Sequence, residues 1–485
     1  MKGSLNKGFL SYLLLFVGLL MACVLIMMTI MLLSPGTSIL GYCYVRQTKV
    51  YTIDTFDGDD GTNYVDNEGN KISFANEENK KFIDFSKIDV LNILANCSSV
   101  KVRRGDFSRI KVTTTVKGFA KSKDVKDVVV NKCYDTEFSL SIDVQDQNYL
   151  WTIADGRVIE ITLSEYDYNE LEVNIFTKKG NIAFANDKAN TINENIMIFG
   201  TIKAKSEDGN IWLSDDVNPN GLLKKIDLNT KKGDITVGNV KKFVVETAPE
   251  NNRIPTVTLT AQNGKITTKD IQADVLTLAG EKTKTDIGNI EANKVDFHIK
   301  SGIVKLGNIT GDLADSNEVA NNVKLDVGDV SGSVVLPQLT DSEVTFGNIG
   351  GDVLISTKAG SVNIKKASKK IDIRTQGGKI DIKIANGENT TYLSTKKGAI
   401  NAKFADVKGQ NDILSENGQI SISYIQNDIF KLTAKAKNIN FKSENKTIKD
   451  QATGYPSTSN SEVATSDIVN VQTKGDVDIY SVPGV

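Results

Sequence analysis

The sequence contains few side chains of the kinds that usually catalyse reactions or bind metals. Among its 485 residues there is one histidine, His298, and there are four cysteines. His298 lies between Phe297 and Ile299 in an alternating segment, so its imidazole should face solvent from a strand, with no predicted partner. We therefore predict no metal site, no cofactor and no histidine-based acid–base chemistry.

Carboxylates are the remaining candidates for catalysis. Hydrolysis of a polysaccharide needs carboxylates that flank one bond, and on a β-helix these would lie on adjacent coils. Asp234 and Asp381 take outward positions shortly after a recurring glycine, but they belong to repeats far apart in the chain. The residues one and three positions after these glycines form no matched column. We predict that the chain is not an enzyme, and a carbohydrate-active β-helix enzyme is the least favoured alternative.

Residues 54–70, DTFDGDDGTNYVDNEGN, are rich in the oxygen ligands that Ca²⁺ prefers. The segment lacks the ligand spacing and the distal glutamate of an EF-hand loop. Two interpretations therefore stay open, a Ca²⁺ site and a solvated turn, and the second is favoured.

Trp212 is the candidate for an exposed binding aromatic. It lies between Ile211 and Leu213, so the alternation of the strand should turn it outward. An exposed indole can stack on a sugar ring or anchor a partner. The alternative is a tryptophan that is covered by a loop.

A repeat that fills most of the chain must position these side chains. The phrase TKKGDITVGNV at 230–240 returns in altered form as TKKGNIAFAN at 177 and TKKGAINAKF at 395. Measured from Gly233, the positions at −7, −5, −3, +2 and +4 are Ile226, Leu228, Thr230, Ile235 and Val237. The recurring glycines are Gly180, Gly209, Gly233, Gly264, Gly302, Gly360, Gly378, Gly398, Gly418 and Gly475. The same pattern occurs without glycine at Thr283, Val323, Ser342 and Lys437.

About fourteen copies at a period near 20 residues predict an all-β fold, a single-stranded parallel β-solenoid (β-helix) in which each copy is one coil. A coil is too short to bury its own apolar face, so neighbouring coils share one core. We expect the glycines at corners, where their backbone conformation costs other residues more. A second corner recurs as VGN at 237, IGN at 287, LGN at 306, VGD at 327 and FGN at 346. No helix follows these glycines, so they do not form a dinucleotide-binding loop.

Five segments are predicted along the chain. They are a short cytoplasmic N-terminus (1–8), a transmembrane helix (9–33), a juxtamembrane stalk (34–85), an N-terminal β cap region (86–170) and the β-solenoid repeat domain (171–485). The apolar run 9–33 is long enough to span a bilayer and too long for the apolar core of a signal peptide. LMAC at 20–23 loosely matches a lipoprotein cleavage site, but the apolar run continues beyond it.

Charge and cysteines constrain partners and location. Lys2 and Lys7 precede the apolar run and favour an N-terminus inside the cell, with everything after Leu33 outside. In that compartment Cys97 and Cys133 could form a disulfide, and two free buried thiols are the equal alternative. The 58 basic and 60 acidic residues give a net charge of −2, so no nucleic-acid partner and no other polyanion is expected.

The segments IDVLNILANCSSVKVRRGDFSRIKVT and IEITLSEYDYNELEVNIFTKKGNIAF, followed by serial KxGxIxV coils, resemble a bacterial adhesin-like family. This family is a domain-of-unknown-function group of β-solenoids, often found behind a membrane anchor. The resemblance covers residues 86–485. It implies a cell-surface protein and carries no catalytic signature.

The sequence thus predicts a single-pass, surface-displayed β-solenoid that acts as an adhesin-like or envelope interaction protein, with host or envelope glycans or proteins as partners. The runner-up is a bactofilin-like scaffold that polymerises through open solenoid ends. The final SVPGV is expected to close the last coil, and the regular tail before it leaves this choice open. A sensory ectodomain is disfavoured, because about eight residues precede the span.

Overall fold

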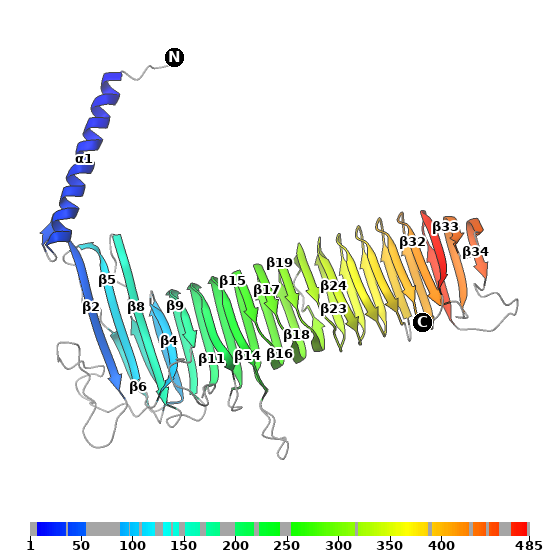
Figure 1. The fold of residues 1–485 in the computed structure, drawn as a ribbon, viewed down its shortest axis with the longest axis horizontal. Coiled ribbons are helices and arrows are strands. Elements are labelled where there is room, and N and C mark those ends of the chain that lie inside the picture. The colour runs from blue at the N-terminus through cyan, green and yellow to red at the C-terminus, as the bar shows by residue number, and fades with distance from the viewer. Residues whose placement is uncertain are drawn as a thin grey trace. The chain divides into compact units, whose positions relative to one another are not determined.

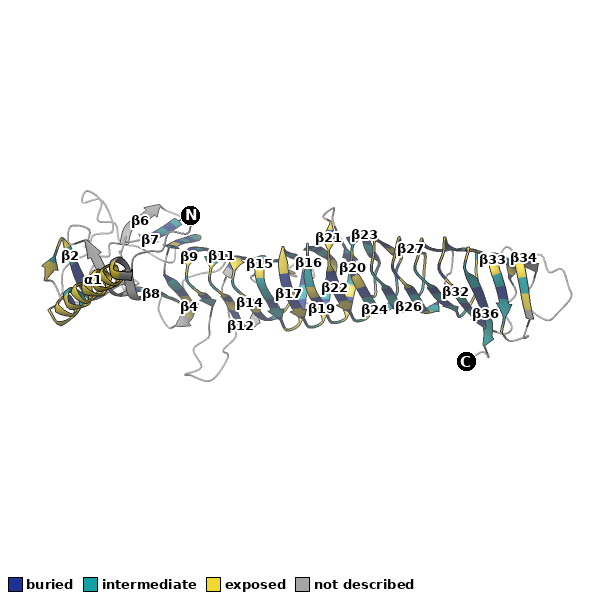
Figure 2. Cartoon of the chain, turned by 90° about the horizontal axis from the view of Figure 1, so that it is seen from above, coloured by how far each residue is buried: buried dark blue, intermediate teal, exposed yellow. Residues whose placement is uncertain are grey.

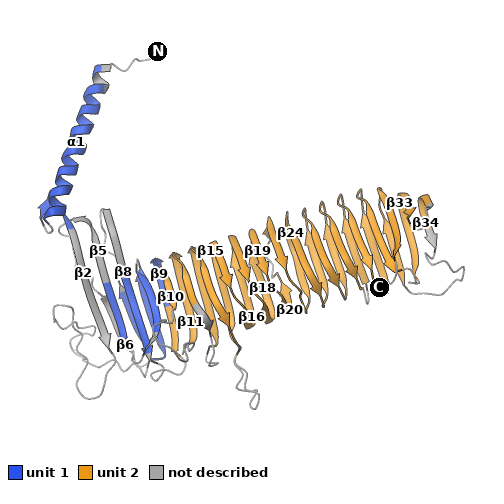
Figure 3. Ribbon diagram, viewed as in Figure 1, with its two compact units in different colours: residues 1–168, 175–180 blue, residues 169–174, 181–485 orange. Residues whose placement is uncertain are grey.

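A computed structural model describes most of the chain. The described residues are 7–34, 37–54, 88–96, 98–105, 109–121, 130–136, 139–144, 151–164, 171–184, 199–217, 223–242, 254–315, 319–386, 390–425, 430–442, 446–454 and 467–482. They form two compact units, one of Met1–Tyr168 with Ile175–Gly180 and one of Asn169–Asn174 with Asn181–Val485 (Figure 3).

Helix α1, Lys7–Leu33, contains the predicted membrane span. Its 27 residues make a helix of about 40 Å, which exceeds the roughly 30 Å of a bilayer core. Ser11–Leu33 carries no charged residue and is strongly apolar, and none of its most apolar window is buried inside the protein. The helix is therefore long and apolar enough to cross a membrane.

The first unit continues with eight strands. They are β1 (Ser38–Ile39), β2 (Tyr42–Asp54), β3 (Val90–Asn96), β4 (Ser99–Gly105), β5 (Arg109–Lys121), β6 (Val130–Thr136), β7 (Ser139–Val144) and β8 (Trp151–Ser164). β3 pairs with β7 and β4 with β8 in parallel, as coils of a solenoid do. β5 pairs antiparallel with β8, and β6 pairs antiparallel with β7.

The segment predicted as a stalk, 34–85, contains the regular strand β2 in its first part. β2 pairs antiparallel with β5 along its whole length, from Tyr42 opposite Lys121 to Asp54 opposite Arg109. The aromatic and β-branched residues of this stretch fit a pleated sheet, and the turn-rich text begins only after Asp54. Residues 55–87 lie outside the described residues.

The second unit is built from the repeats. Its strands are β9 (Leu171–Lys179, shared with the first unit), β10 (Ile182–Phe184), β11 (Phe199–Asp208), β12 (Ile211–Val217), β13 (Lys225–Lys232), β14 (Ile235–Val240), β15 (Thr256–Thr268), β16 (Ile271–Gly280), β17 (Lys282–Ile287), β18 (Ile290–Ile299), β19 (Gly302–Leu306), β20 (Ile309–Ala314), β21 (Ala320–Asn321), β22 (Val323–Val327), β23 (Val334–Thr340), β24 (Glu343–Ile349), β25 (Val353–Thr357), β26 (Val362–Ala367), β27 (Ile371–Thr375), β28 (Ile380–Ala385), β29 (Thr390–Thr395), β30 (Ile400–Phe404), β31 (Gln410–Ser415), β32 (Ile420–Ile425), β33 (Lys431–Phe441), β34 (Lys446–Gly454), β35 (Ile468–Gln472) and β36 (Asp476–Val482).

Most of these strands pair in parallel with the strand two places further along the chain (Figure 1). On one face β25, β27, β29 and β31 follow one another, and on the opposite face β26, β28, β30 and β32 do the same. The register places Gly264 opposite Thr283, Thr283 opposite Gly302 and Gly302 opposite Val323. The parallel β-solenoid is confirmed, including copies that lack the glycine.

The core is the interior between the two stacks of strands. Ile226, Leu228, Ile235 and Val237 are at most 1% exposed, as the repeat pattern predicts. Phe184, Phe297, Phe346 and Phe404 are among the largest fully buried side chains. Figure 2 shows buried and exposed positions alternating along the strands. Each fully buried aliphatic side chain stabilises the stack by about 1.5–3 kcal/mol.

The C-terminal end departs from sequential stacking. β35 pairs in parallel with both β31 and β33, and β36 pairs in parallel with both β32 and β33. The last two strands are thus inserted inside the stack, and β34 pairs antiparallel on the outer side of β33. The expectation that the tail closes the last coil was wrong, because the hairpin β33–β34 occupies that place.

Candidate binding surface

The recurring glycines stack on one another at one corner of the coils. A Cβ atom on Gly378 would lie 1.4 Å from the carbonyl oxygen of Gly360, and one on Gly398 would lie 1.8 Å from that of Gly378. The φ angle is positive at Gly233 (148°), Gly302 (133°) and Gly360 (139°), and at Gly378 and Gly398 no positive φ occurs. The close approach of successive backbones therefore requires glycine at more of these corners than backbone conformation does.

Hydroxyl side chains line the inner side of this corner. Thr395 Oγ1 donates to the carbonyl of Gly378 at 3.3 Å and accepts from the N–H of Gly398 at 3.0 Å. Thr473 makes the same two contacts with Gly418 and Gly475, at 2.7 and 2.9 Å. Thr395 lies three residues before its glycine and Thr473 lies two residues before its glycine, and both are buried and hydrogen-bonded.

The second corner is held by a ladder of asparagine and aspartate side chains. The backbone N–H of Asn289 donates to Asp270, that of Asn308 to Asn289, that of Asp329 to Asn308 and that of Asn348 to Asp329, over 2.7–3.2 Å. The backbone N–H of Asn348 and, to a smaller extent, its side-chain amide lower the pKa of the Asp329 carboxyl. The side-chain oxygens at this corner already accept hydrogen bonds from backbone N–H groups of the next coil, so the corner has a structural role.

An open surface groove lies on the second unit. Its volume is about 860 Å³, and it crosses the ends of β23, β25, β27, β29, β31 and β35. Its lining residues are Val319, Pro337, Gln338, Leu339, Thr340, Ser356, Thr357, Lys358, Arg374, Thr375, Gln376, Ser394, Thr395, Lys396, Leu414, Ser415, Glu416, Lys435, Gln472, Thr473 and Lys474.

The strand register arranges these residues in three columns along the groove. The central column is the buried hydroxyl ladder described above. The first flanking column, set by pairing of β25, β27, β29, β31, β35 and β33, is Ser356, Arg374, Ser394, Leu414, Gln472 and Lys435. The second flanking column, which follows the hydroxyl residues, is Lys358, Gln376, Lys396, Glu416 and Lys474. We call this second column the lysine column.

Arg374 is held in a fixed position at the middle of the groove. Its guanidinium donates two hydrogen bonds to Asp372, at 2.8 and 2.9 Å, and lies 4.8 Å from the ring centre of Tyr392. The hydrogen bonds to Asp372 raise the pKa of Arg374, so it stays charged. Asp372 binds the guanidinium through both carboxylate oxygens and so offsets its positive charge. Arg374 therefore contributes shape and hydrogen bonds to the groove more than net positive charge.

The lysine column carries most of the uncompensated charge of the groove, and Lys435 of the first flanking column adds one more exposed charge. Among the described residues, Lys358, Lys396 and Lys474 form no ion pair, and all three are exposed. Glu416 is the single carboxylate that lines the groove. The lining residues include no histidine or cysteine. The arrangement can bind an extended ligand through hydroxyl, amide and ammonium groups.

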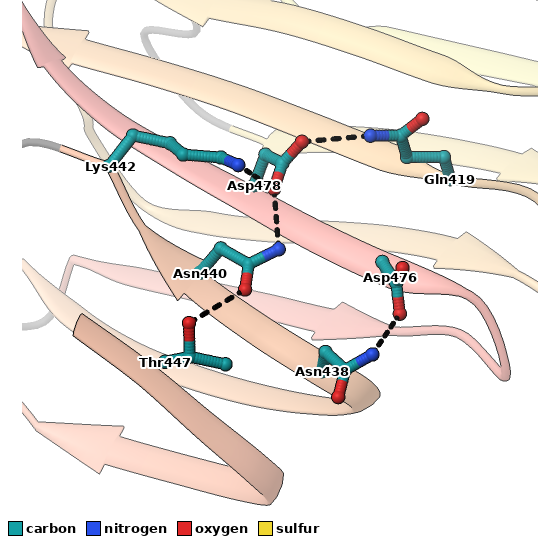
Figure 4. Close-up of polar contacts among 7 residues, drawn as sticks. All are labelled: Gln419, Asn438, Asn440, Lys442, Thr447, Asp476 and Asp478. Atoms are coloured by element: carbon teal, nitrogen blue, oxygen red, sulfur yellow. Dashed lines mark hydrogen bonds and ion pairs between the residues drawn. The ribbon is translucent and has the colours of Figure 1, made fainter. Parts of the chain in front are cut away.

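Figure 4 shows a second polar cluster, around the inserted strand β36. Asp478 is 7% exposed and accepts from Gln419, just before β32, and from Asn440 on β33, at 2.8 and 2.7 Å, with Lys442 at 3.3 Å. Asp476 accepts from Asn438 at 2.7 Å. Both carboxylate oxygens of Asp478 already have partners within the protein. We therefore assign this cluster a structural role, in which it holds β36 between its neighbouring strands.

The structure does not gather the predicted site residues into one site, although Trp212 and Asp234 lie on adjacent coils. Trp212 lies on β12 and is 41% exposed, as predicted. His298 is half-buried on β18, on the outward side. Asp234 accepts from the backbone N–H of Lys265, and Asp381 pairs with Lys379 at 2.7 Å. No two of these side chains come together.

Two of the predictions fall on residues that the structure leaves undescribed. Cys97 and residues 55–70 lie outside the described residues, so the disulfide with Cys133 and the Ca²⁺ segment stay predictions. Within the described part of the chain, no group of histidine, cysteine, aspartate and glutamate side chains could hold a metal ion. Eight of the ten recurring glycines lie between strands, while Gly264 lies within β15 and Gly302 begins β19.

Sequence reasoning missed the groove because it compared the wrong columns. Only the positions one and three residues after each glycine were compared. The position two residues before the glycine holds Lys178, Lys231, Lys358 and Lys396, and a lysine also precedes Gly475. That recurrence was readable in the repeated phrase TKKG.

Comparison with known families gives one match. The family described as Toastrack DUF4097 matches residues 88–338, slightly more than half of the chain. The matched stretch begins two residues after the predicted start of the β region. No curated protein and no solved structure matches the chain.

Proposed function

This chain belongs to the Toastrack DUF4097 family, and we propose that it is a membrane-anchored, non-catalytic binding protein that displays its β-solenoid at the cell surface. In this adhesin-like role the solenoid is a rigid support for an extended binding surface. The ligand contacts polar side chains that stacked coils present at a regular spacing.

The groove across β23 to β35 is the observation that carries this proposal. Its volume is about 860 Å³ and its sides are polar side chains from successive coils. A site that extends along the stack suits a long ligand with many weak contacts, because each coil adds one similar set of groups. Trp212, exposed on β12, is a second candidate contact.

Helix α1 supports the anchoring role. A span of Ser11–Leu33 matches a bilayer by length and composition. Lys2 and Lys7 favour an N-terminus on the cytoplasmic side, which would leave the solenoid outside. We propose this orientation.

The C-terminal end favours a binding protein over a filament-forming scaffold. A solenoid that polymerises end to end needs a terminal coil whose strands can pair in parallel with the next chain. Here β34 lies antiparallel on the outer side of β33 and interrupts the parallel order.

Labelling of intact cells tests this function. An epitope tag is placed after Val485, and antibody binding is compared before and after permeabilisation, with a cytoplasmic protein carrying the same tag as control. Labelling of intact cells is expected. Labelling only after permeabilisation would contradict surface display and make the cytoplasmic scaffold the better explanation.

A further inference from the structure

We propose that the groove over β23 to β35 binds a linear acidic polysaccharide in which charged sugars alternate with neutral ones. This inference rests on the proposed binding function and names its ligand class. It follows from the spacing of charges in the lysine column and from the neutral groups between them.

The positive charges recur at every second coil. Lys358 follows β25 and Lys396 follows β29, with β27 between them. Lys396 and Lys474 are likewise separated by one strand, β31. Since parallel strands lie about 4.8 Å apart, the ammonium groups recur at about 10 Å along the groove. Two sugar rings in an extended chain cover about the same length, so one carboxylate per disaccharide meets each lysine.

The groups between the lysines do not suit a densely charged polymer. Gln376 and Glu416 occupy the intervening positions of the lysine column. A duplex nucleic acid carries a phosphate about every 3.4 Å along each strand, so it would place phosphates beside Glu416. A polymer with a neutral sugar at that position avoids this repulsion and can donate a hydroxyl hydrogen bond to Glu416.

The opposite flank of the groove provides mainly neutral hydrogen-bonding groups between β25 and β35, interrupted by Leu414, and an exposed Lys435 lies at its C-terminal end. Ser356, Ser394 and Gln472 can donate to and accept from sugar hydroxyls. Arg374, fixed between the two serines by Asp372, offers its remaining N–H groups to the ligand. This flank selects a hydroxyl-rich chain over an apolar or purely ionic ligand.

The overall net charge of −2 does not oppose this ligand. Charges further apart than about 8 Å are largely screened at physiological ionic strength, so the ligand senses the groove more than the whole chain. The expectation of no polyanion partner, drawn from net charge, is therefore revised for this surface. We expect little long-range electrostatic attraction of the ligand to the protein, and an affinity that falls strongly with added salt.

Calorimetric titration of the full chain in detergent micelles tests the ligand class. The probe is a hyaluronan oligosaccharide, in which glucuronate alternates with N-acetylglucosamine. A chitin oligosaccharide of equal length is the neutral control, and a single-stranded DNA oligonucleotide is the densely charged control. Binding of the hyaluronan oligosaccharide alone, weakened by added salt, is expected.

Matched lysine variants locate the binding. The triple variant Lys358→Gln, Lys396→Gln, Lys474→Gln should lose about 10-fold or more in affinity, as expected for three exposed charge contacts. The control variant Lys365→Gln, Lys383→Gln, Lys403→Gln changes net charge equally on β26, β28 and β30, the opposite stack, and should bind as the unchanged protein does. Glu416→Gln should leave binding intact or strengthen it.

The possible failures have different meanings. Equal affinity of the two triple variants would overturn the groove as the site. No binding of the hyaluronan oligosaccharide, or equal binding of the chitin oligosaccharide or the DNA, would overturn the ligand class. None of these outcomes affects surface display, which the labelling experiment decides separately.

Discussion

The buried hydroxyls of the glycine corner explain how the solenoid tolerates tight turns. Thr395 satisfies one backbone carbonyl of the preceding coil and one backbone N–H of its own coil. An unpaired backbone group in such a buried place would cost about 1–3 kcal/mol. The serine or threonine in the repeated phrase is therefore part of the corner together with the glycine.

Thr395→Val should destabilise its coil by about 1–3 kcal/mol, because it removes both hydrogen bonds while keeping the volume. Thr391→Val is the matched control: this residue is equally buried on the same strand, and its hydroxyl finds no partner among the described residues. Hydrogen exchange of β29 and β31, measured by mass spectrometry, reports the local stability. Similar exchange in both variants would contradict the role of the corner hydroxyl.

The lowered pKa of Asp329 predicts that the second corner becomes less stable in acid. Its pKa lies below the ordinary value of 3.8, since the folded ladder stabilises the carboxylate. The stabilisation is therefore complete at pH values above about 3.8 and is lost as the pH falls through the lower folded pKa. Asp329→Asn should show a smaller loss of stability between pH 5 and pH 2 than the unchanged protein. Thermal unfolding across this range measures the difference, and parallel pH profiles would refute it.

At the scale of elements, the inserted pair β35–β36 distinguishes this solenoid from a sequential stack. The pair can take its place only between β31–β32 and the hairpin β33–β34. Its register depends on side chains as well as on backbone pairing, because Asp478 accepts from Gln419, just before β32, and from Asn440 on β33. The C-terminal end of the stack is therefore covered by the hairpin β33–β34, which precedes β35 and β36 in the sequence.

Asp478→Ala should loosen β36, because it leaves the side-chain amides of Gln419 and Asn440 without their acceptor. The expected cost is about 1–3 kcal/mol, and exchange of the amides of Asp476–Val482 should accelerate. Asp381→Ala is the control, since its ion pair with Lys379 is at the surface and contributes little. Unchanged exchange in β36 would show that backbone pairing alone holds the insertion.

At the scale of the whole molecule, the composition hides a local charge pattern. Acidic and basic residues nearly cancel over the chain, while the lining of the groove holds four lysines, one arginine and one glutamate. In a solenoid, the residues at one position of successive coils lie in one column. A repeated lysine therefore gives a local excess of positive charge that the whole composition does not show. Binding surfaces of solenoids are therefore better sought by column than by net charge.

Removal of residues 1–33 should release the chain from the membrane fraction. The full chain should resist extraction at alkaline pH, because transfer of an apolar helix of this length into water is strongly unfavourable. Fractionation followed by immunoblotting measures both forms. A truncated chain that still pellets with membranes would point to a second membrane contact.

The residue pattern alone determined the fold class, the coil register and the core. Alternation with period two and a recurrence near 20 residues leave few ways to bury apolar residues, so Ile226, Leu228, Ile235 and Val237 were predictable as core positions. The exposure of Trp212 followed from the same alternation. The glycine corners followed as well, although their main cause is the approach of the next coil.

Only the tertiary structure decided the pairing of β2 with β5, the insertion of β35–β36 and the groove. The first two join segments far apart in the chain, and a local pattern does not specify which distant edge a strand will meet. The groove depends on side chains of six or more coils that share a column. Its charge exists only once the coils are stacked, because Lys358, Lys396 and Lys474 are 38 and 78 residues apart in sequence and about 10 Å apart in space.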